Sequence, residues 1–91
     1  MAKFKKIEVL NKMAAAPMVP VFYHADAATA CAVVKACYDG GVRAFEFTNR
    51  GDFAHEVFAE VVKFAARECP DMAVGVGSVV EPGTASLYMQ L

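Results

Sequence analysis

Hydrophobic residues recur at helical spacing along much of the chain. In residues 3–15 they alternate with lysines that occupy the opposite side of the predicted helix. A second such pattern follows Asp26, a favourable helix N-cap residue. It stops before Gly40 and Gly41, where one glycine can take the left-handed conformation that ends a helix. These stretches therefore predict two helices in the first forty residues.

The second half of the chain carries two more helical patterns. One runs from about residue 52 to residue 68 and is stopped by Pro70. The other begins at Glu81 and Pro82, because proline is well tolerated in the first turn of a helix. It continues to the last residue, Leu91, without a sequence signal that would end it.

Three short apolar runs, at residues 18–23, 42–48 and 72–76, lie between these helices. Their content of valine, phenylalanine and tyrosine predicts buried strands. Pro20 argues against a central position for the first strand, because proline donates no hydrogen bond to a neighbour. A helix followed by three strand–helix units predicts an α/β fold with a parallel sheet. Both the doubly wound sheet and the (βα)8 barrel have this order of elements.

Gly75–Val76–Gly77 favours the doubly wound sheet, because a dinucleotide-binding turn contains two such glycines. That fingerprint also needs a glycine or alanine three residues after the second glycine, where Val80 stands. We therefore reject a nucleotide-binding sheet on this evidence.

The alternation of side chains along the second strand favours the barrel. One set of alternate positions begins with small apolar residues and ends in a carboxylate, a hydroxyl and a guanidinium, whereas the other set carries two phenylalanines that suit packing against helices. A barrel interior is likewise apolar below and reactive at its carboxyl-terminal mouth. The first set is Val42, Ala44, Glu46, Thr48 and Arg50, and the second is Arg43, Phe45 and Phe47. The third strand repeats the pattern with Val74, Val76 and Ser78.

Composition and charge exclude several classes of protein. The formal net charge is −1, so the chain lacks the positive charge of a nucleic-acid-binding domain, and 57% hydrophobic residues exclude a disordered chain. No apolar run is long enough to span a membrane. Glu8 breaks the apolar stretch that a signal peptide would need near the amino terminus. The cysteines Cys31, Cys37 and Cys69 show no metal-ligand spacing and are expected to pack as small hydrophobes in a reducing cytoplasm.

Glu46 is the candidate catalytic residue. A carboxyl group on a strand face, near a guanidinium, suits general acid–base catalysis. The alternative is a purely structural ion pair of Glu46 with Arg43 or Arg50. His24 follows the first strand and is either a substrate contact or a polar loop residue.

The segments MVPVFY, GGVRAFEFTNRG and AVGVGSV resemble the first three strands of the 2-keto-3-deoxy-6-phosphogluconate and 4-hydroxy-2-oxoglutarate aldolases. The family pattern reads roughly VVPV, GGVxLEvTlRt and vGaGTVl. The glutamate followed four residues later by arginine is the more specific part of the match, and the Gly-x-Gly element is less so. The resemblance covers nearly all of this chain, which would be the amino-terminal portion of one truncated (βα)8 barrel domain (residues 1–91).

The resemblance implies a cytoplasmic homotrimer that cleaves a 2-keto-4-hydroxy acid to pyruvate and an aldehyde through a lysine Schiff base, without cofactor or metal. Glu46 would move protons, and Arg50 would hold the pyruvoyl carboxylate. Thr48 and Ser78 would also bind substrate, with Ser78 standing where the family usually has threonine.

The Schiff-base lysine of the family lies on a later strand than this chain contains. Lys35 and Lys63 fall in helices with the wrong context, so the 91 residues alone are expected to be inactive. Two alternatives remain open: a non-catalytic fragment that associates with itself to cover its open sheet edge, and another phosphate-handling barrel. The partner would be a small keto acid, and neither a nucleic acid nor a membrane.

Overall fold

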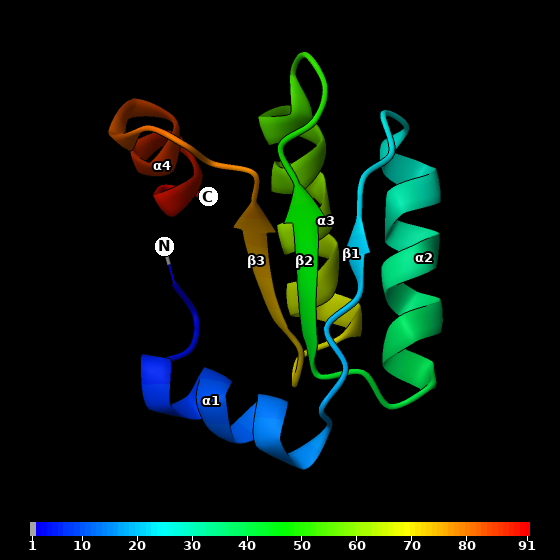
Figure 1. Cartoon of the computed structure of the whole chain (residues 1–91). Coiled ribbons are helices and arrows are strands. Elements are labelled where there is room, and N and C mark those ends of the chain that lie inside the picture. Colours follow the sequence, from blue (N-terminus) through cyan, green and yellow to red (C-terminus); the bar gives the residue numbers. More distant parts are fainter. Residues whose placement is uncertain (1) are drawn as a thin grey trace.

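The computed structural model describes residues 2–91, which form one layer of parallel strands and a layer of helices (Figure 1). The elements in chain order are α1 (Lys6–Ala15), β1 (Val21–Phe22), α2 (Ala27–Asp39), β2 (Ala44–Thr48), α3 (Ala54–Glu68), β3 (Ala73–Gly77) and α4 (Pro82–Met89). The predicted α/β class and the order of a helix followed by three strand–helix units are confirmed.

The sheet has the order β1-β2-β3, and both strand pairs are parallel. In Figure 1 α3 lies behind the sheet and α2 stands next to β1, and α1 crosses below the amino-terminal ends of the strands. Residues of α2 and α3 pack together against one face of the sheet. Because the strands are parallel, the loops that follow β1, β2 and β3 all lie at the same edge of the sheet (Figure 1). This edge is where a parallel α/β fold places its reactive groups.

Local capping explains where two helices begin. The carboxylate of Asp26 accepts hydrogen bonds from the N–H of Thr29 at 2.9 Å and from its hydroxyl at 2.7 Å, as predicted for an N-cap. Glu81 caps α4 by accepting from the N–H of Gly83 at 2.7 Å and from Thr84. Gly41 has a φ of 104°, which confirms the predicted left-handed glycine after α2.

The alternation predicted along β2 is also confirmed. Phe45 and Phe47 are 2% and 0% exposed and belong to the core that α2 and α3 form with the sheet. The rings of Phe47 and Phe58 of α3 have centroids 6.0 Å apart. Glu46 is half-buried, and the alternation of side chains along a strand places it on the opposite face from Phe45 and Phe47.

For β3 the predicted assignment of faces is wrong. Glu46 pairs with Gly75, and Phe47 pairs with Val76. Since laterally paired residues of parallel strands point to the same face, Val74 and Val76 lie on the helical side, where they pack against the core. The two glycines of β3, rather than its valines, therefore lie on the face of Glu46.

The first strand is shorter and more exposed than predicted. Only Val21 and Phe22 form β1, and Val21 is 52% exposed. Pro20 gives the physical reason, because it donates no hydrogen bond and β1 has a single neighbour within residues 2–91. The carbonyl of Pro20 still accepts a hydrogen bond of 2.9 Å from the N–H of Glu46.

Two helices begin later than predicted. The carboxylate of Glu8 accepts the N–H of Lys5 at 2.6 Å, and α1 begins at the next residue. Its apolar side stays open, because Ile7 is 61% exposed. Helix α3 begins at Ala54, since Phe53 adopts a left-handed conformation (φ 59°) that a right-handed helix cannot include.

The three cysteines are free, and Cys69 is completely buried in the core. Cys31 and Cys37 pack partly against the same core, as predicted for thiols that act as small hydrophobes. Burial raises the pKa of the thiols of Cys31 and Cys69, which keeps them protonated and unreactive. Among the helices that the structure describes, none has the length and apolar character needed to cross a membrane.

Candidate active site

Glu46 projects from the middle of β2 over the neighbouring strand β3. Its backbone is fixed from both sides, because its N–H donates to Pro20 and its register partner is Gly75. Its carboxyl group leans toward the carboxyl-terminal end of β3 and occupies the space that a Cβ on Gly77 would need. The absence of a side chain at Gly77 therefore makes room for this carboxylate on the uncovered face of the sheet.

Thr48 lies two residues after Glu46 on the same strand face, and its side chain connects β2 to β1. Its hydroxyl donates a hydrogen bond of 3.1 Å to the carbonyl of Phe22, and the residue is 2% exposed. The proton of the hydroxyl is thus used to join β2 to β1. Within the described residues Thr48 is therefore buried, and its hydroxyl serves the pairing of these two strands.

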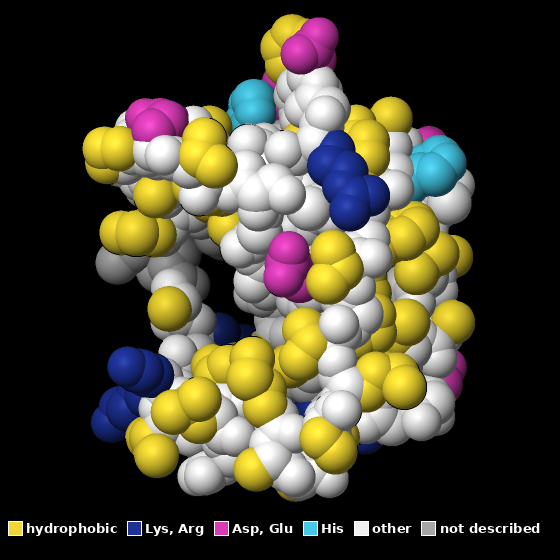
Figure 2. Space-filling view, in the orientation of Figure 1, with side chains coloured by type: hydrophobic (Ala, Val, Ile, Leu, Met, Phe, Trp, Pro, Cys, Tyr) yellow, Lys and Arg dark blue, Asp and Glu magenta, His cyan; other side chains and the backbone are white. Residues whose placement is uncertain are grey.

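Arg50 lies in the loop after β2 and is exposed to solvent. Its N–H donates to the carbonyl of Thr48 at 2.9 Å, which turns the chain immediately after the strand. Within residues 2–91 no ion pair joins Glu46 to Arg50. Figure 2 looks onto this face and shows acidic and basic side chains near one another over the sheet. A carboxylate ligand would meet a free guanidinium here.

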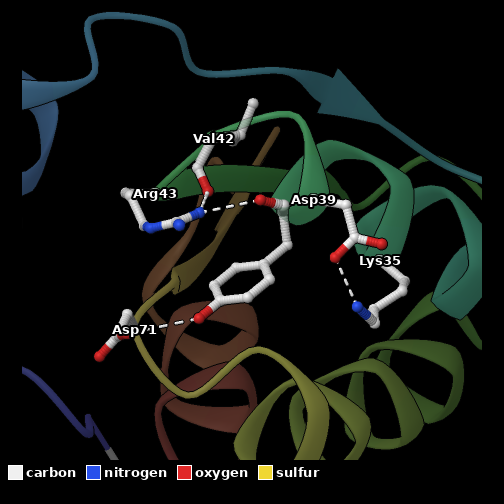
Figure 3. A network of polar contacts seen from close by, with 6 residues as sticks. Lys35, Asp39, Val42, Arg43 and Asp71 are labelled. Atoms are coloured by element: carbon white, nitrogen blue, oxygen red, sulfur yellow. Dashed lines mark hydrogen bonds and ion pairs between the residues drawn. The ribbon is translucent and has the colours of Figure 1, made fainter.

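Arg43 is occupied at the other end of β2. Its Nη1 donates to the carbonyls of Tyr38 and Val42 at 2.9 Å and 2.8 Å, and its guanidinium lies 4.1 Å from the centre of the Tyr38 ring. The hydroxyl of Tyr38 donates to Asp71 at 3.3 Å (Figure 3). This network ties the amino-terminal end of the sheet together. The structural alternative of a Glu46–Arg43 pair is therefore excluded.

Ser78 is the first residue after β3 and is exposed, with a left-handed backbone (φ 59°). Its carbonyl accepts a hydrogen bond from Asn49 Nδ2 at 3.5 Å. A residue other than glycine in this conformation is strained by about 1 kcal/mol or more, so the surrounding contacts hold it there. Ser78 and Arg50 therefore stand on adjacent loops at the same edge of the sheet.

His24 is exposed in the loop after β1, and its Nδ1 accepts the N–H of Asp26 at 2.9 Å. Its ring stacks on that of Phe22, with centroids 6.5 Å apart. Both contacts give His24 a structural role in the loop. Within residues 2–91 there is no group of three His, Cys, Asp or Glu side chains arranged to hold a metal ion.

Lysines that could form a Schiff base must lose their proton near neutral pH. Lys35 pairs with Asp39 at 2.5 Å, and this partner raises the pKa of the amine. Lys63 pairs with Glu60 at 3.1 Å on the surface of α3. Both lysines lie on helices, as predicted, and each amine has a carboxylate partner there.

Comparison with known proteins shows the family to which the chain belongs. A family model for the KDPG and KHG aldolases matches residues 9–89. The chain belongs to the KDPG and KHG aldolase family.

Two curated relatives agree with this assignment. The 2-dehydro-3-deoxy-phosphogluconate aldolase of Dickeya dadantii is 37% identical over 70 residues, which are 77% of this chain and 31% of the relative. The protein of the same name from Pseudoalteromonas atlantica is 34% identical over 79 residues, which are 87% of this chain and 35% of the relative. The chain thus spans about one third of the length of these aldolases.

Three further residues shape this site, of which the sequence singled out only Gly77, as part of the Gly-x-Gly element. Gly77 makes room for Glu46, and Asn49 and Tyr88 connect the loops that carry Arg50 and Ser78. A hydrophilic Asn directly after an apolar strand was a usable signal, because such a residue needs partners at the sheet edge. Tyr88 gave no such signal, since it reads as one more apolar position of a helix.

Proposed function

We propose that this chain supplies the proton-transfer and carboxylate-binding groups of a class I aldolase that cleaves a 2-keto-4-hydroxy acid to pyruvate and an aldehyde. The observation that carries the proposal is the placement of the Glu46 carboxylate over Gly77, below the loops that present Arg50 and Ser78. The names of the two relatives support a substrate of the 2-dehydro-3-deoxy-phosphogluconate class.

We propose a (βα)8 barrel for the whole domain, of which residues 1–91 form the amino-terminal portion. Three parallel strands with helices packed on one face support this architecture, because a barrel has its helices on the outer face only. Three strands are too few to close a barrel, so the proposal needs further strands of the same domain. A groove of about 1070 Å³ runs beside β3, lined by α3, α4 and residues 2–9 of the amino-terminal segment, and its lining is mostly apolar. Further strand–helix units of the same barrel would cover this groove.

The proposed reaction divides its work between this chain and a lysine outside these 91 residues. That lysine would condense with the keto carbon of the substrate to form a protonated imine. Arg50 would pair with the carboxylate next to this carbon, and Ser78 would donate a hydrogen bond to it. Thr48, which is buried, would support substrate binding by holding β2 against β1 beside the site.

Glu46 would move the protons. As a carboxylate it takes the proton from the C4 hydroxyl while the C3–C4 bond breaks, which releases the aldehyde and leaves the bond electrons in an enamine. Protonation of the enamine at C3 and addition of water to the resulting imine then release pyruvate and the lysine. The uncovered, half-buried position of Glu46 gives it access to both substrate and water.

A chimera tests this proposal directly. This chain would replace the matching segment of the Dickeya dadantii aldolase, and cleavage would be followed by coupled detection of pyruvate. We expect Glu46→Gln to reduce turnover by about 10²–10⁴-fold, as for the loss of a general acid–base group. Glu60→Gln is the matched control, because Glu60 is exposed on α3 and pairs only with Lys63. Equal turnover in the Glu46→Gln and Glu60→Gln chimeras would overturn the role of Glu46.

Self-association of the 91-residue chain is the second candidate, and the open groove beside β3 favours it. It predicts that sedimentation velocity shows a mass that increases with concentration. If the 91-residue chain is a monomer at all concentrations and the chimera is active, the aldolase proposal is supported instead. The homotrimer and the cytoplasmic location implied by the resemblance stay predictions.

A further inference from the structure

Asn49 connects three separate parts of the chain at the carboxyl-terminal edge of the sheet. Its N–H donates to the carbonyl of Gly77 at 3.0 Å, which extends the pairing of β2 and β3 by one residue. Its side-chain Nδ2 lies 3.5 Å from the carbonyl of Ser78, and its Oδ1 accepts the hydroxyl of Tyr88 at 2.9 Å. One side chain thus joins the end of β2 to the end of β3 and to α4.

Tyr88 is suited to hold this connection. It is 5% exposed, and its ring packs edge-to-face on Phe58 of α3 with centroids 5.1 Å apart. Burial, and to a smaller extent the neighbouring Tyr23, raise the pKa of the Tyr88 hydroxyl, so that it stays protonated and remains a donor. The ring anchors the hydroxyl to the core while the hydroxyl anchors Asn49.

The two proposed carboxylate-binding residues are direct neighbours of this connection. Arg50 follows Asn49 in the chain, and the carbonyl that Asn49 contacts belongs to Ser78. Ser78 is held in a left-handed conformation that it would readily leave without partners. A bidentate contact to a carboxylate requires its donors in fixed relative positions.

We propose that the Asn49–Tyr88 hydrogen bond positions Arg50 and Ser78 relative to each other for recognition of the substrate carboxylate. Asn49 and Tyr88 are positioning residues, which act on the substrate only through the two loops. This inference rests on the proposed function, because it assumes that Arg50 and Ser78 bind the substrate carboxylate.

Tyr88→Phe tests the proposal, because it removes the hydroxyl and keeps the ring on Phe58. Tyr38→Phe is the matched control, since it removes a tyrosine hydroxyl that bonds Asp71 at the opposite end of the sheet. The 91-residue chain, labelled with ¹⁵N, would be titrated with pyruvate and followed by amide chemical shifts. Heteronuclear NOEs would report the order of the Arg50 and Ser78 amides.

We expect Tyr88→Phe to weaken pyruvate binding by about three- to tenfold, as for one lost hydrogen bond, and to lower the NOEs of Arg50 and Ser78. Tyr38→Phe should change neither, although both variants lose a hydrogen bond and some stability. Asn49→Leu should have the same effect as Tyr88→Phe, and the double variant should be no worse than either single one. Unchanged NOEs and affinity in Tyr88→Phe, or equal changes in Tyr38→Phe, would overturn the proposal.

The outcomes also separate this proposal from the function on which it rests. If the unmodified chain binds no pyruvate, the assignment of Arg50 and Ser78 to carboxylate binding fails. Lower NOEs at these two residues in Tyr88→Phe alone would then still establish that the hydrogen bond orders the two loops. Unchanged NOEs would reject that ordering as well.

Discussion

The carboxylate of Glu46 lies where a Cβ on Gly77 would stand, although the register partner of Glu46 is Gly75, two residues earlier. The side chain therefore leans along β3 toward the carboxyl-terminal edge, where the loops begin. This position of the carboxylate needs a glycine at position 77 because of the close approach, and not because of an unusual backbone conformation, since Gly77 lies within a regular strand.

Gly77→Ala should displace the Glu46 carboxylate from its position. We expect turnover of the chimeric aldolase to fall by about 100-fold, because a shift of about 1 Å in a reacting group has an effect of that size. Gly75→Ala is the control, since a Cβ there meets no atom within 4 Å. Equal turnover in the two variants would show that the position of Glu46 over Gly77 has no catalytic importance.

Phe53→Gly should stabilise the chain. Phe53 precedes α3 with a φ of 59° and is 67% exposed, so its ring contributes little packing while its backbone is strained. Phe53→Ala removes the same ring but keeps a Cβ, and it serves as the matched control. We expect the glycine variant to exceed the alanine variant in unfolding free energy by about 1 kcal/mol, measured by urea denaturation. A glycine variant less stable than the alanine variant would contradict the strain at Phe53.

Acid should weaken the capping of α2. The side-chain and backbone hydrogen bonds from Thr29 lower the pKa of Asp26 below its ordinary value of 3.8. A pKa that is lower in the folded than in the unfolded state stabilises the fold above the unfolded value. This contribution is lost as the pH falls through 3.8 toward the lower pKa of the folded chain.

Asp26→Asn provides the measurement for this cap. Asparagine keeps an acceptor oxygen for Thr29 but does not titrate, so the variant should lose less unfolding free energy than the native chain between about pH 5 and pH 2. Urea denaturation across this range gives the two curves. Parallel curves would show that Asp26 contributes nothing to the acid sensitivity.

The 91-residue chain alone should form no covalent imine with pyruvate. Lys35 and Lys63 are ion-paired on the surfaces of helices, and Asp39 raises the pKa of the Lys35 amine, so neither lysine is in the desolvated setting that a Schiff-base amine needs. Incubation with pyruvate and borohydride, followed by intact mass, should give only the unmodified mass. A stoichiometric adduct on one lysine would mean that a nucleophile is present within these residues.

Several features of the molecule could be predicted from the sequence because they depend on neighbours within one element. The α/β order follows from hydrophobic spacing, and the start of α2 follows from Asp26, whose carboxylate needs only the next turn of the helix. The opposite directions of Glu46 and Phe45 follow from the two-residue period of an extended strand. Glu46 could be selected as the site residue on this basis, as a polar group at the reactive end of an otherwise apolar face.

Other features were decided only when the strands were paired. The faces of β3 depend on its register with β2, and the glycines of β3 lie beside Glu46 because Glu46 pairs with Gly75. Alternation within β3 alone assigns two sets of residues but does not say which set joins the face of β2 that carries Glu46. The length of β1 also depends on pairing. Within residues 2–91 it has one neighbouring strand, and Pro20 directly before it offers no donor, so it is shorter than its apolar composition predicts.

The contact between Asn49 and Tyr88 shows most clearly what the sequence pattern does not predict. The two residues are 39 positions apart, and they meet only because the chain brings α4 back beside the carboxyl-terminal end of β3. Sequence periodicity describes which side of an element a residue occupies. The partner that it meets there is chosen by the packing of elements distant in the chain, which is a property of the tertiary structure.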